Sequence, residues 1–201
     1  MQLGGKPGGR RVGRRMLALS ALVTLALAGC TALSGPPNAI FDLSAPRGSG
    51  VARGGLQILV PQPTAVAALD TNRIAARPSP SEYAYIGGSV WSDSLPKLVQ
   101  ARLVQYLQNS GRVKAAAIPG QGLLIDYQLV VDIRAFELAP TGAVADFAVR
   151  LMDDRNGRVI RSRVFRAEVP VASADARGVV PALDQAMNLI FEQIGPWAFS
   201  G

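Results

Sequence analysis

The feature that most constrains the fold is a strict alternation of apolar and polar side chains in the second half of the chain. In residues 124–138, "LIDYQLVVDIRAFEL", one face of an extended strand would carry Tyr127, Leu129, Val131, Ile133 and Ala135. A second run at 144–152, "VADFAVRLM", alternates in the same way and leads through "DDRNG" at 153–157 into a third run at 158–171. Period-two alternation indicates strands with one buried and one solvated face, and Asn-Gly is a strong hairpin signal. We therefore predict a meander of three long antiparallel strands.

Two other segments have the spacing of an amphipathic helix. Residues 92–111, "SDSLPKLVQARLVQYLQNSG", place apolar side chains on one helical face, with Asp93 or Ser94 as the N-cap and Gly111 at the end. Residues 175–195 carry a second apolar stripe, which we expect to end at Gly195-Pro196. Shorter strand-like runs lie at 39–43, 56–60, 72–77 and 82–87. We predict one α+β domain over residues 39–201, with a mostly antiparallel sheet and both helices packed on one of its faces.

The first thirty residues have the pattern of an export signal. A basic stretch ending in Arg14-Arg15 precedes an apolar run at 16–28, which stops at small side chains. A bilayer-spanning helix needs roughly 20 apolar residues, so this run is too short to span. The box "LAGC" at 27–30 resembles the lipobox of bacterial lipoproteins, in which the cysteine is acylated and becomes the first residue of the mature chain. The alternative is an ordinary signal peptide in which Cys30 is incidental.

A lipobox divides the N-terminal region into a signal peptide at 1–29, removed by cleavage between Gly29 and Cys30, and a lipidated N-terminus and linker at 30–38. Diacylglycerol and a fatty acid such as palmitate on Cys30 would anchor the mature chain, because each buried methylene contributes about 0.8 kcal/mol and two or three chains together hold a protein stably. Residue 31 is Thr, not the aspartate that resembles an inner-membrane retention signal. We therefore expect the inner leaflet of the outer membrane, facing the periplasm.

Composition excludes several classes of chemistry. The 201 residues include no histidine and one cysteine, which excludes imidazole chemistry, a Cys-His site and an intramolecular disulfide. The formal charge is +7, but five basic residues precede the apolar run, and without them 16 basic residues stand against 14 acidic ones, so nucleic acid is not an expected partner. Asp153 and Asp154 could be proposed as a catalytic carboxylate pair, but adjacent strand residues point to opposite faces, and Asp is common beside tight turns. We assign no catalytic residue, no metal and no cofactor other than the covalent lipid.

Six side chains are candidates for contact with lipid or a partner: Trp91, Phe136, Arg150, Arg161, Arg163 and Trp197. The three arginines belong to the predicted hairpin and could form a patch that binds anionic headgroups or an acidic protein; the alternative is the solvated side of the sheet. In the alternation of its strand, Phe136 occupies a position on the polar side, which indicates either a bulge or an exposed contact residue. Trp197 follows the last predicted helix and either forms an interface or packs back on the domain.

Short motifs between residues 69 and 111 carry a family resemblance. They are Leu69-Asp70, Arg73-Ile74, Tyr83, Tyr85, Trp91, Leu95-Pro96 and Ser110-Gly111. In this order they resemble the ABC-type transport auxiliary lipoprotein family, which includes the paraquat-inducible-type intermembrane transport lipoproteins. Phe136-Glu137 matches the Phe-Glu end of a later strand in that family, and Phe41 in "IFDL" stands where the family commonly has tyrosine.

The resemblance implies a protein without enzymatic activity. It would be a lipid-anchored periplasmic accessory subunit of an ABC transporter that moves phospholipid or other hydrophobic molecules between the inner and outer membranes. Its expected partners are a mammalian-cell-entry-type substrate-binding subunit with its permease and ATPase, membrane lipid, and further copies of the chain. The alternatives are a lipoprotein that assembles or chaperones envelope components and a periplasmic hydrolase that uses carboxylates alone. The resemblance provides no binding residue to carry over.

Overall fold

The structure is a computed structural model that describes residues 1–2, 4–5, 39–48 and 55–199. The chain divides into two units, Met1–Pro37 and Asn38–Gly201, and the fold that follows is that of the second unit. Gly29, Cys30, the predicted linker at 30–38 and all but four residues of the predicted signal peptide lie outside the described residues. In the part of the chain that is described, no helix is long and apolar enough to cross a membrane.

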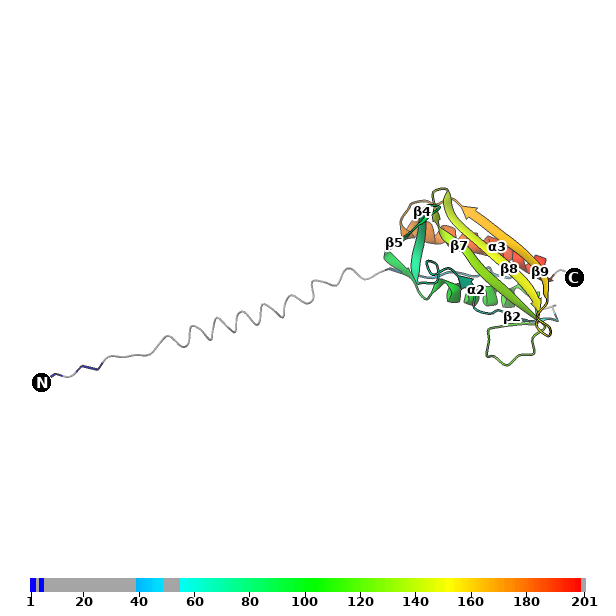
Figure 1. Cartoon of the computed structure of the whole chain (residues 1–201), viewed down its shortest axis with the longest axis horizontal. Coiled ribbons are helices and arrows are strands. Elements are labelled where there is room, and N and C mark those ends of the chain that lie inside the picture. The colour runs from blue at the N-terminus through cyan, green and yellow to red at the C-terminus, as the bar shows by residue number, and fades with distance from the viewer. Residues whose placement is uncertain (3, 6–38, 49–54, 200–201) are drawn as a thin grey trace. The chain divides into compact units, whose positions relative to one another are not determined.

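Three long strands form the predicted meander: β7 (Tyr127–Ala139), β8 (Gly142–Asp153) and β9 (Val159–Val169) (Figure 1). They pair antiparallel in sequence order, and β7 and β8 pair from Tyr127 opposite Asp153 to Ala139 opposite Gly142, with one register shift between Ile133 and Ala135. Gly157, in the turn between β8 and β9, has a φ of 69°, the left-handed conformation that the Asn-Gly signal indicates. The predicted meander is confirmed.

The second edge of β7 is shared by three short strands that pair with it in parallel, one after another. These are β2 (Gln57–Leu59), β3 (Thr64–Ala65) and β4 (Arg73–Ser79). β4 pairs antiparallel with β5 (Glu82–Trp91), while β1 (Ala39–Phe41) and β6 (Ala115–Ala117) pair in parallel with β5 and β2. The sheet is therefore mixed, with its long pairings antiparallel as predicted. Alternation could not reveal β3 and β6, because two or three residues are too few to establish a period.

Helices α2 (Leu95–Ser110) and α3 (Ala176–Phe199) lie behind the strands in Figure 1, and their apolar faces join the sheet in one hydrophobic core. α2 begins after Ser94 and ends at Gly111, whose φ is 65°, as predicted. Two side-chain amides tie α2 to the short strands: Gln100 donates to the Val60 carbonyl and Gln108 to that of Ala116.

The predicted end of the last helix at Gly195-Pro196 is wrong, because α3 continues to Phe199. Packing stabilises the additional turn: Ala198 is buried, and the Trp197 ring meets the Phe165 ring edge-on with centroids 5.4 Å apart. The Arg161 guanidinium also donates to the Trp197 carbonyl at 2.6 Å. This bond satisfies a terminal carbonyl and places a cation at the negative end of the helix dipole, offsetting part of the cost of a proline.

A bulge in β7 reverses the inward and outward sides of the strand. The register with β8 shifts between Ile133 and Ala135, so that Phe136 pairs with inward-facing Ala145 and Glu137 with Val144 on the other face. Phe136 is 1% exposed and its ring centroid lies 6.0 Å from that of Trp91, which is 2% exposed. The bulge alternative for Phe136 is thus confirmed. Trp91 and Phe136 belong to the core, and the prediction that they contact a partner at the surface is wrong.

Candidate functional site

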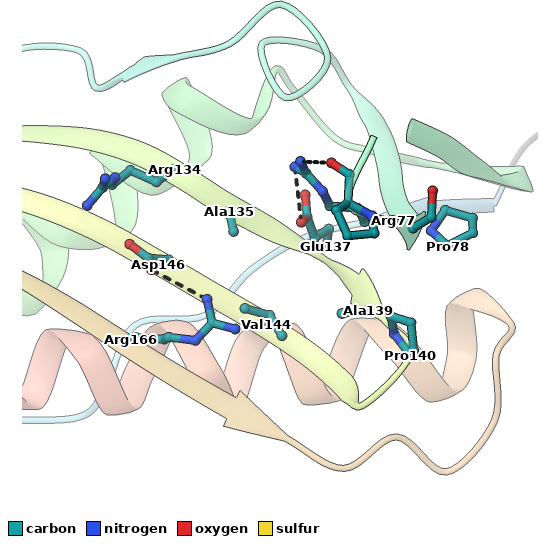
Figure 2. Close-up of a pocket in the computed structure, with 12 residues that line it drawn as sticks. Arg77, Pro78, Arg134, Ala135, Glu137, Ala139, Pro140, Val144, Asp146 and Arg166 are labelled. Carbon is teal, nitrogen blue, oxygen red and sulfur yellow. Dashed lines mark hydrogen bonds and ion pairs between the residues drawn. The ribbon is translucent and has the colours of Figure 1, made fainter. Parts of the chain in front are cut away.

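A pocket of about 540 Å³ opens on the face of the sheet away from α3, where β4 ends and β7 turns into β8. Its charged lining comes from four strands and consists of Arg77, Arg134, Glu137, Asp146 and Arg166, which are labelled in Figure 2. Its apolar lining includes Pro78, Ala139, Pro140 and Val144. The bulge in β7 positions this site, because it places Glu137 on the open face while Phe136 enters the core.

Glu137 is only 4% exposed and holds Arg77 at the inner wall of the pocket. An Arg77 guanidinium nitrogen lies 3.6 Å from Glu137 Oε1, and it donates to the Tyr83 hydroxyl at 2.6 Å. The other terminal nitrogen donates to the Pro80 carbonyl at 2.6 Å. Burial raises the pKa of Glu137, and the positive charge of Arg77 offsets part of this rise. Burial and the neighbouring Glu137 charge also raise the pKa of Tyr83.

Arg166 and Arg134 line the outer part of the pocket. The Arg166 side chain is 56% exposed and lies 3.5 Å from the carboxylate of Asp146, which is 17% exposed, and 3.9 Å from that of Glu168. Arg134 is exposed, and its side chain makes no hydrogen bond or ion pair with any residue that the structure describes. Carboxylates therefore position two of the guanidinium groups, while the third is available at the rim.

The geometry is that of a binding pocket for a polar group. Arginine side chains from β4, β7 and β9 line it, and guanidinium groups are donors that recognise phosphate or carboxylate oxygens. Among the residues that the structure describes, no group of three or more acidic, cysteine or histidine side chains could hold a metal ion. Asp153 and Asp154 lie at the β8–β9 turn, where Asp153 accepts from the Arg155 amide at 2.9 Å and Asp154 from Gln128 at 2.7 Å. Asp153 thus has the turn contact expected from the sequence, while Asp154 binds a side chain of the neighbouring strand β7.

The three candidate arginines of the hairpin do not form one patch, and that prediction is wrong. Arg150 pairs across the strands with Ser162 on the open face, whereas Arg161 and Arg163 pair with the inward-facing Leu151 and Val149. Paired residues project to the same side of a sheet, so Arg150 and the other two point to opposite sides. Arg161 binds the Trp197 carbonyl, and the Arg163 guanidinium lies 4.9 Å from the centre of the Phe165 ring.

Trp197 is half-buried against Phe165, which corresponds to packing back on the domain. The sequence analysis missed Arg77, Arg134, Glu137 and Asp146 as site residues, and Arg166 was not among its six candidates. They lie on four strands and come together through the parallel pairing of β4 with β7 and through the bulge. The one local signal was Phe136, an apolar residue at a position where the alternation predicts a polar side chain. This signal indicated the bulge, but it did not indicate that the bulge places Glu137 in a pocket.

Comparisons with known proteins agree with the fold and with the sequence motifs. A protein of Bradyrhizobium diazoefficiens, itself uncharacterized, is 32% identical over 162 residues, which are 78% of this chain and 44% of that protein. The chain therefore spans less than half the length of this curated relative. A crystal structure of a Xanthomonas campestris protein superposes with a TM-score of 0.73 at 26% identity, over 80% of this chain and 94% of the other. A second solved structure, of an uncharacterized protein, has a TM-score of 0.65 at 19% identity, over 81% and 99% of the two chains, and shows the same fold.

The sequence profile of the family described as "ABC-type transport auxiliary lipoprotein component" matches residues 41–195. These residues include all three strands of the meander, α2, and α3 up to the point where the helix was first expected to end. The family name describes a lipoprotein that works with an ABC transporter, and the match covers most of the folded unit. This chain belongs to the ABC-type transport auxiliary lipoprotein family.

Proposed function

We propose that this protein is a lipid-anchored periplasmic accessory subunit of an ABC transporter with a mammalian-cell-entry-type subunit, moving phospholipid or another hydrophobic substrate between the two membranes. The observation that carries the proposal is the family match over residues 41–195. The motifs between residues 69 and 111 support the mammalian-cell-entry connection by resemblance. The lipobox at 27–30, with Thr31 after it, supports anchoring through Cys30 at the outer membrane.

In this proposal the chain has no enzymatic activity and no cofactor besides the acyl groups on Cys30. Histidine is absent from the sequence, and the two adjacent aspartates bind the turn and Gln128. The pocket on the open face holds its carboxylates against arginines, which leaves cationic donors rather than a free base toward a ligand. The protein would contribute docking and ligand contact, and a separate subunit would hydrolyse ATP.

The test is affinity capture of the full-length protein after extraction from the membrane, with identification of the proteins and lipids that accompany it. We expect a permease, an ATPase and a subunit with a mammalian-cell-entry domain in the captured material. Recovery of an outer-membrane assembly complex without those subunits would overturn the proposal in favour of an envelope assembly role.

Cys30→Ser is the matched variant for the anchor. We expect it to remove the acylated species from mass spectra of the intact protein and to shift the protein out of the outer-membrane fraction. Thr31→Ser, next to it, should leave both readouts unchanged. An outer-membrane location that survives loss of the thiol would contradict lipid anchoring through Cys30.

A further inference from the structure

A second pocket adjoins the arginine-lined pocket and differs from it in chemistry. It has a volume of about 360 Å³, and its own lining is apolar, from Ala76, Leu138, Val171 and Ala174. Four residues, Arg77, Pro78, Ala139 and Pro140, line both pockets. The end of β4 and the turn between β7 and β8 therefore form a wall common to both pockets. The polar pocket lies on the open face, and the apolar pocket lies on the side of Leu138, which pairs with the core residue Ala143.

The polar pocket presents guanidinium groups rather than carboxylates to a ligand. Glu137 Oε2 and Asp146 Oδ1 are buried without a hydrogen-bond partner among the described residues, while the side chains of Arg77 and Arg166 are 31% and 56% exposed. Arg134 adds a third, exposed guanidinium at the rim. Buried carboxylates hold and orient the cations, and the exposed N–H groups of the cations remain able to bind an anion.

We propose that the paired pockets bind an anionic amphiphile, with a phosphate-bearing head at Arg77, Arg134 and Arg166 and the first part of one acyl chain in the apolar pocket beyond Pro78 and Pro140. This inference rests on the proposed function and specifies the chemistry of its substrate. The charge of the polar lining selects a negative head, because three arginines stand against two buried acids. The four shared residues lie between the head site on the open face and the apolar pocket on the side of Leu138, so the acyl chain of this ligand would pass over Pro78 and Pro140.

Arg134 and Arg150 provide a matched pair of variants for the test. Both are exposed arginines on the open face, and neither side chain makes a hydrogen bond or ion pair with the residues that the structure describes, but only Arg134 lines the pocket. Arg134→Gln and Arg150→Gln should therefore keep the fold equally well, which thermal unfolding checks. Arg166→Gln is a second pocket variant, from another strand.

The probes separate a lipid from a free phosphate. The full-length protein, in a nonionic detergent at fixed concentration, is titrated with inorganic phosphate, glycerol phosphate, dihexanoyl phosphatidylglycerol and dihexanoyl phosphatidylcholine. We expect phosphatidylglycerol to bind best, Arg134→Gln and Arg166→Gln to weaken it about tenfold or more, and Arg150→Gln to leave it unchanged. Lengthening the acyl chains should tighten binding by up to about fourfold per added methylene until the apolar pocket is full.

Four results would overturn the proposal. They are equal affinity for the two lipids, inorganic phosphate binding as tightly as phosphatidylglycerol, equal losses in the Arg134 and Arg150 variants, and an Arg134→Gln variant that binds lipid normally but loses a transporter subunit on capture. The last result would assign the pocket to an acidic protein segment. If lipid binds as expected but no transporter subunit is captured, the pocket assignment stands and the proposed function fails.

Discussion

Glu137 is the residue where local packing and chemistry are most tightly linked. It is a carboxylate with 4% exposure at the inner wall of the pocket, next to Arg77 and the Tyr83 hydroxyl, and one of its oxygens has no partner among the described residues. A buried carboxylate is costly to ionise unless it is fully paired. Glu137 nevertheless lies where its carboxyl holds Arg77 toward the open face. This arrangement fits a site in which Arg77, and not Glu137, contacts the ligand.

The raised pKa of Glu137 predicts a pH dependence of stability, with burial as the main cause and Arg77 opposing it. The folded state binds the proton more tightly than the unfolded state, whose carboxyl has an ordinary pKa near 4.5. Proton binding to Glu137 therefore stabilises the folded state fully at pH values below about 4.5. This stabilisation is lost as the pH rises through the pKa that Glu137 has in the folded state. Urea denaturation should show wild type losing stability relative to Glu137→Gln across this window.

The comparison with Glu137→Gln isolates this group from other carboxyls. Hydrogen bonds from backbone amides lower the pKa values of Asp93 and Asp175, so these groups add stability as the pH rises. They do so equally in wild type and in Glu137→Gln, and the comparison therefore removes their effect. The charged and titratable groups that face Glu137, which are Arg77, Arg166 and Tyr83, are the same in wild type and in the variant. A stability difference that stays constant with pH would contradict a raised pKa.

At the level of elements, the two hairpin turns place different demands on their glycines. Gly142 starts β8 with a φ of 143°, and a Cβ on it would lie 2.6 Å from the Val169 carbonyl oxygen of β9. Gly157, in the β8–β9 turn, has a φ of 69° and no atom within 4 Å of such a Cβ. The first turn therefore combines backbone strain with a clash against backbone, whereas the second has backbone strain alone.

We predict that Gly142→Ala lowers the free energy of unfolding by about 2–4 kcal/mol and Gly157→Ala by about 1 kcal/mol. Chemical denaturation of the two variants beside wild type measures both values. Because the Gly142 turn carries Ala139 and Pro140, the larger loss should also disturb the wall common to both pockets. Equal losses in the two variants would show that the contact with Val169 relaxes at no cost.

The elements that could be predicted from the sequence are those whose pattern repeats over many residues. The alternation through Tyr127–Ile133 and the stripe of α2 each span several periods, and both were correct. The pattern was insufficient where a single contact determines the local structure. Helix α3 continues past Pro196 because Trp197 packs against Phe165. Glu137 faces the open side of the sheet because β7 has one extra residue near Arg134. The pocket depends on such contacts, together with parallel pairing between strands about 60 residues apart in sequence, such as Ala75 with Glu137.

At the scale of the whole molecule, β7 joins the two halves of the sheet. On one side it carries β8 and β9, and on the other the short strands and, through β4, β5 and β1. Both helices cover the same face, so one core supports the whole sheet and leaves the other face open at the pocket (Figure 1). One face of the sheet thus packs against the helices and stabilises the domain, and the opposite face is open at the pocket.

The unequal edges of β7 have a consequence for amide hydrogen exchange. Its pairing with β8 is long and nearly continuous, but on the other edge it meets β2 at 127–128, β3 at 132–133 and β4 at 137–138. Amides that bond to β8 should exchange only when the domain unfolds globally. Alternate amides of the same strand should exchange by local detachment of a neighbour that pairs with β7 at only two positions. One strand would then show slow and fast amides in alternation, and the fast ones would mark the edge along which the molecule can open without unfolding.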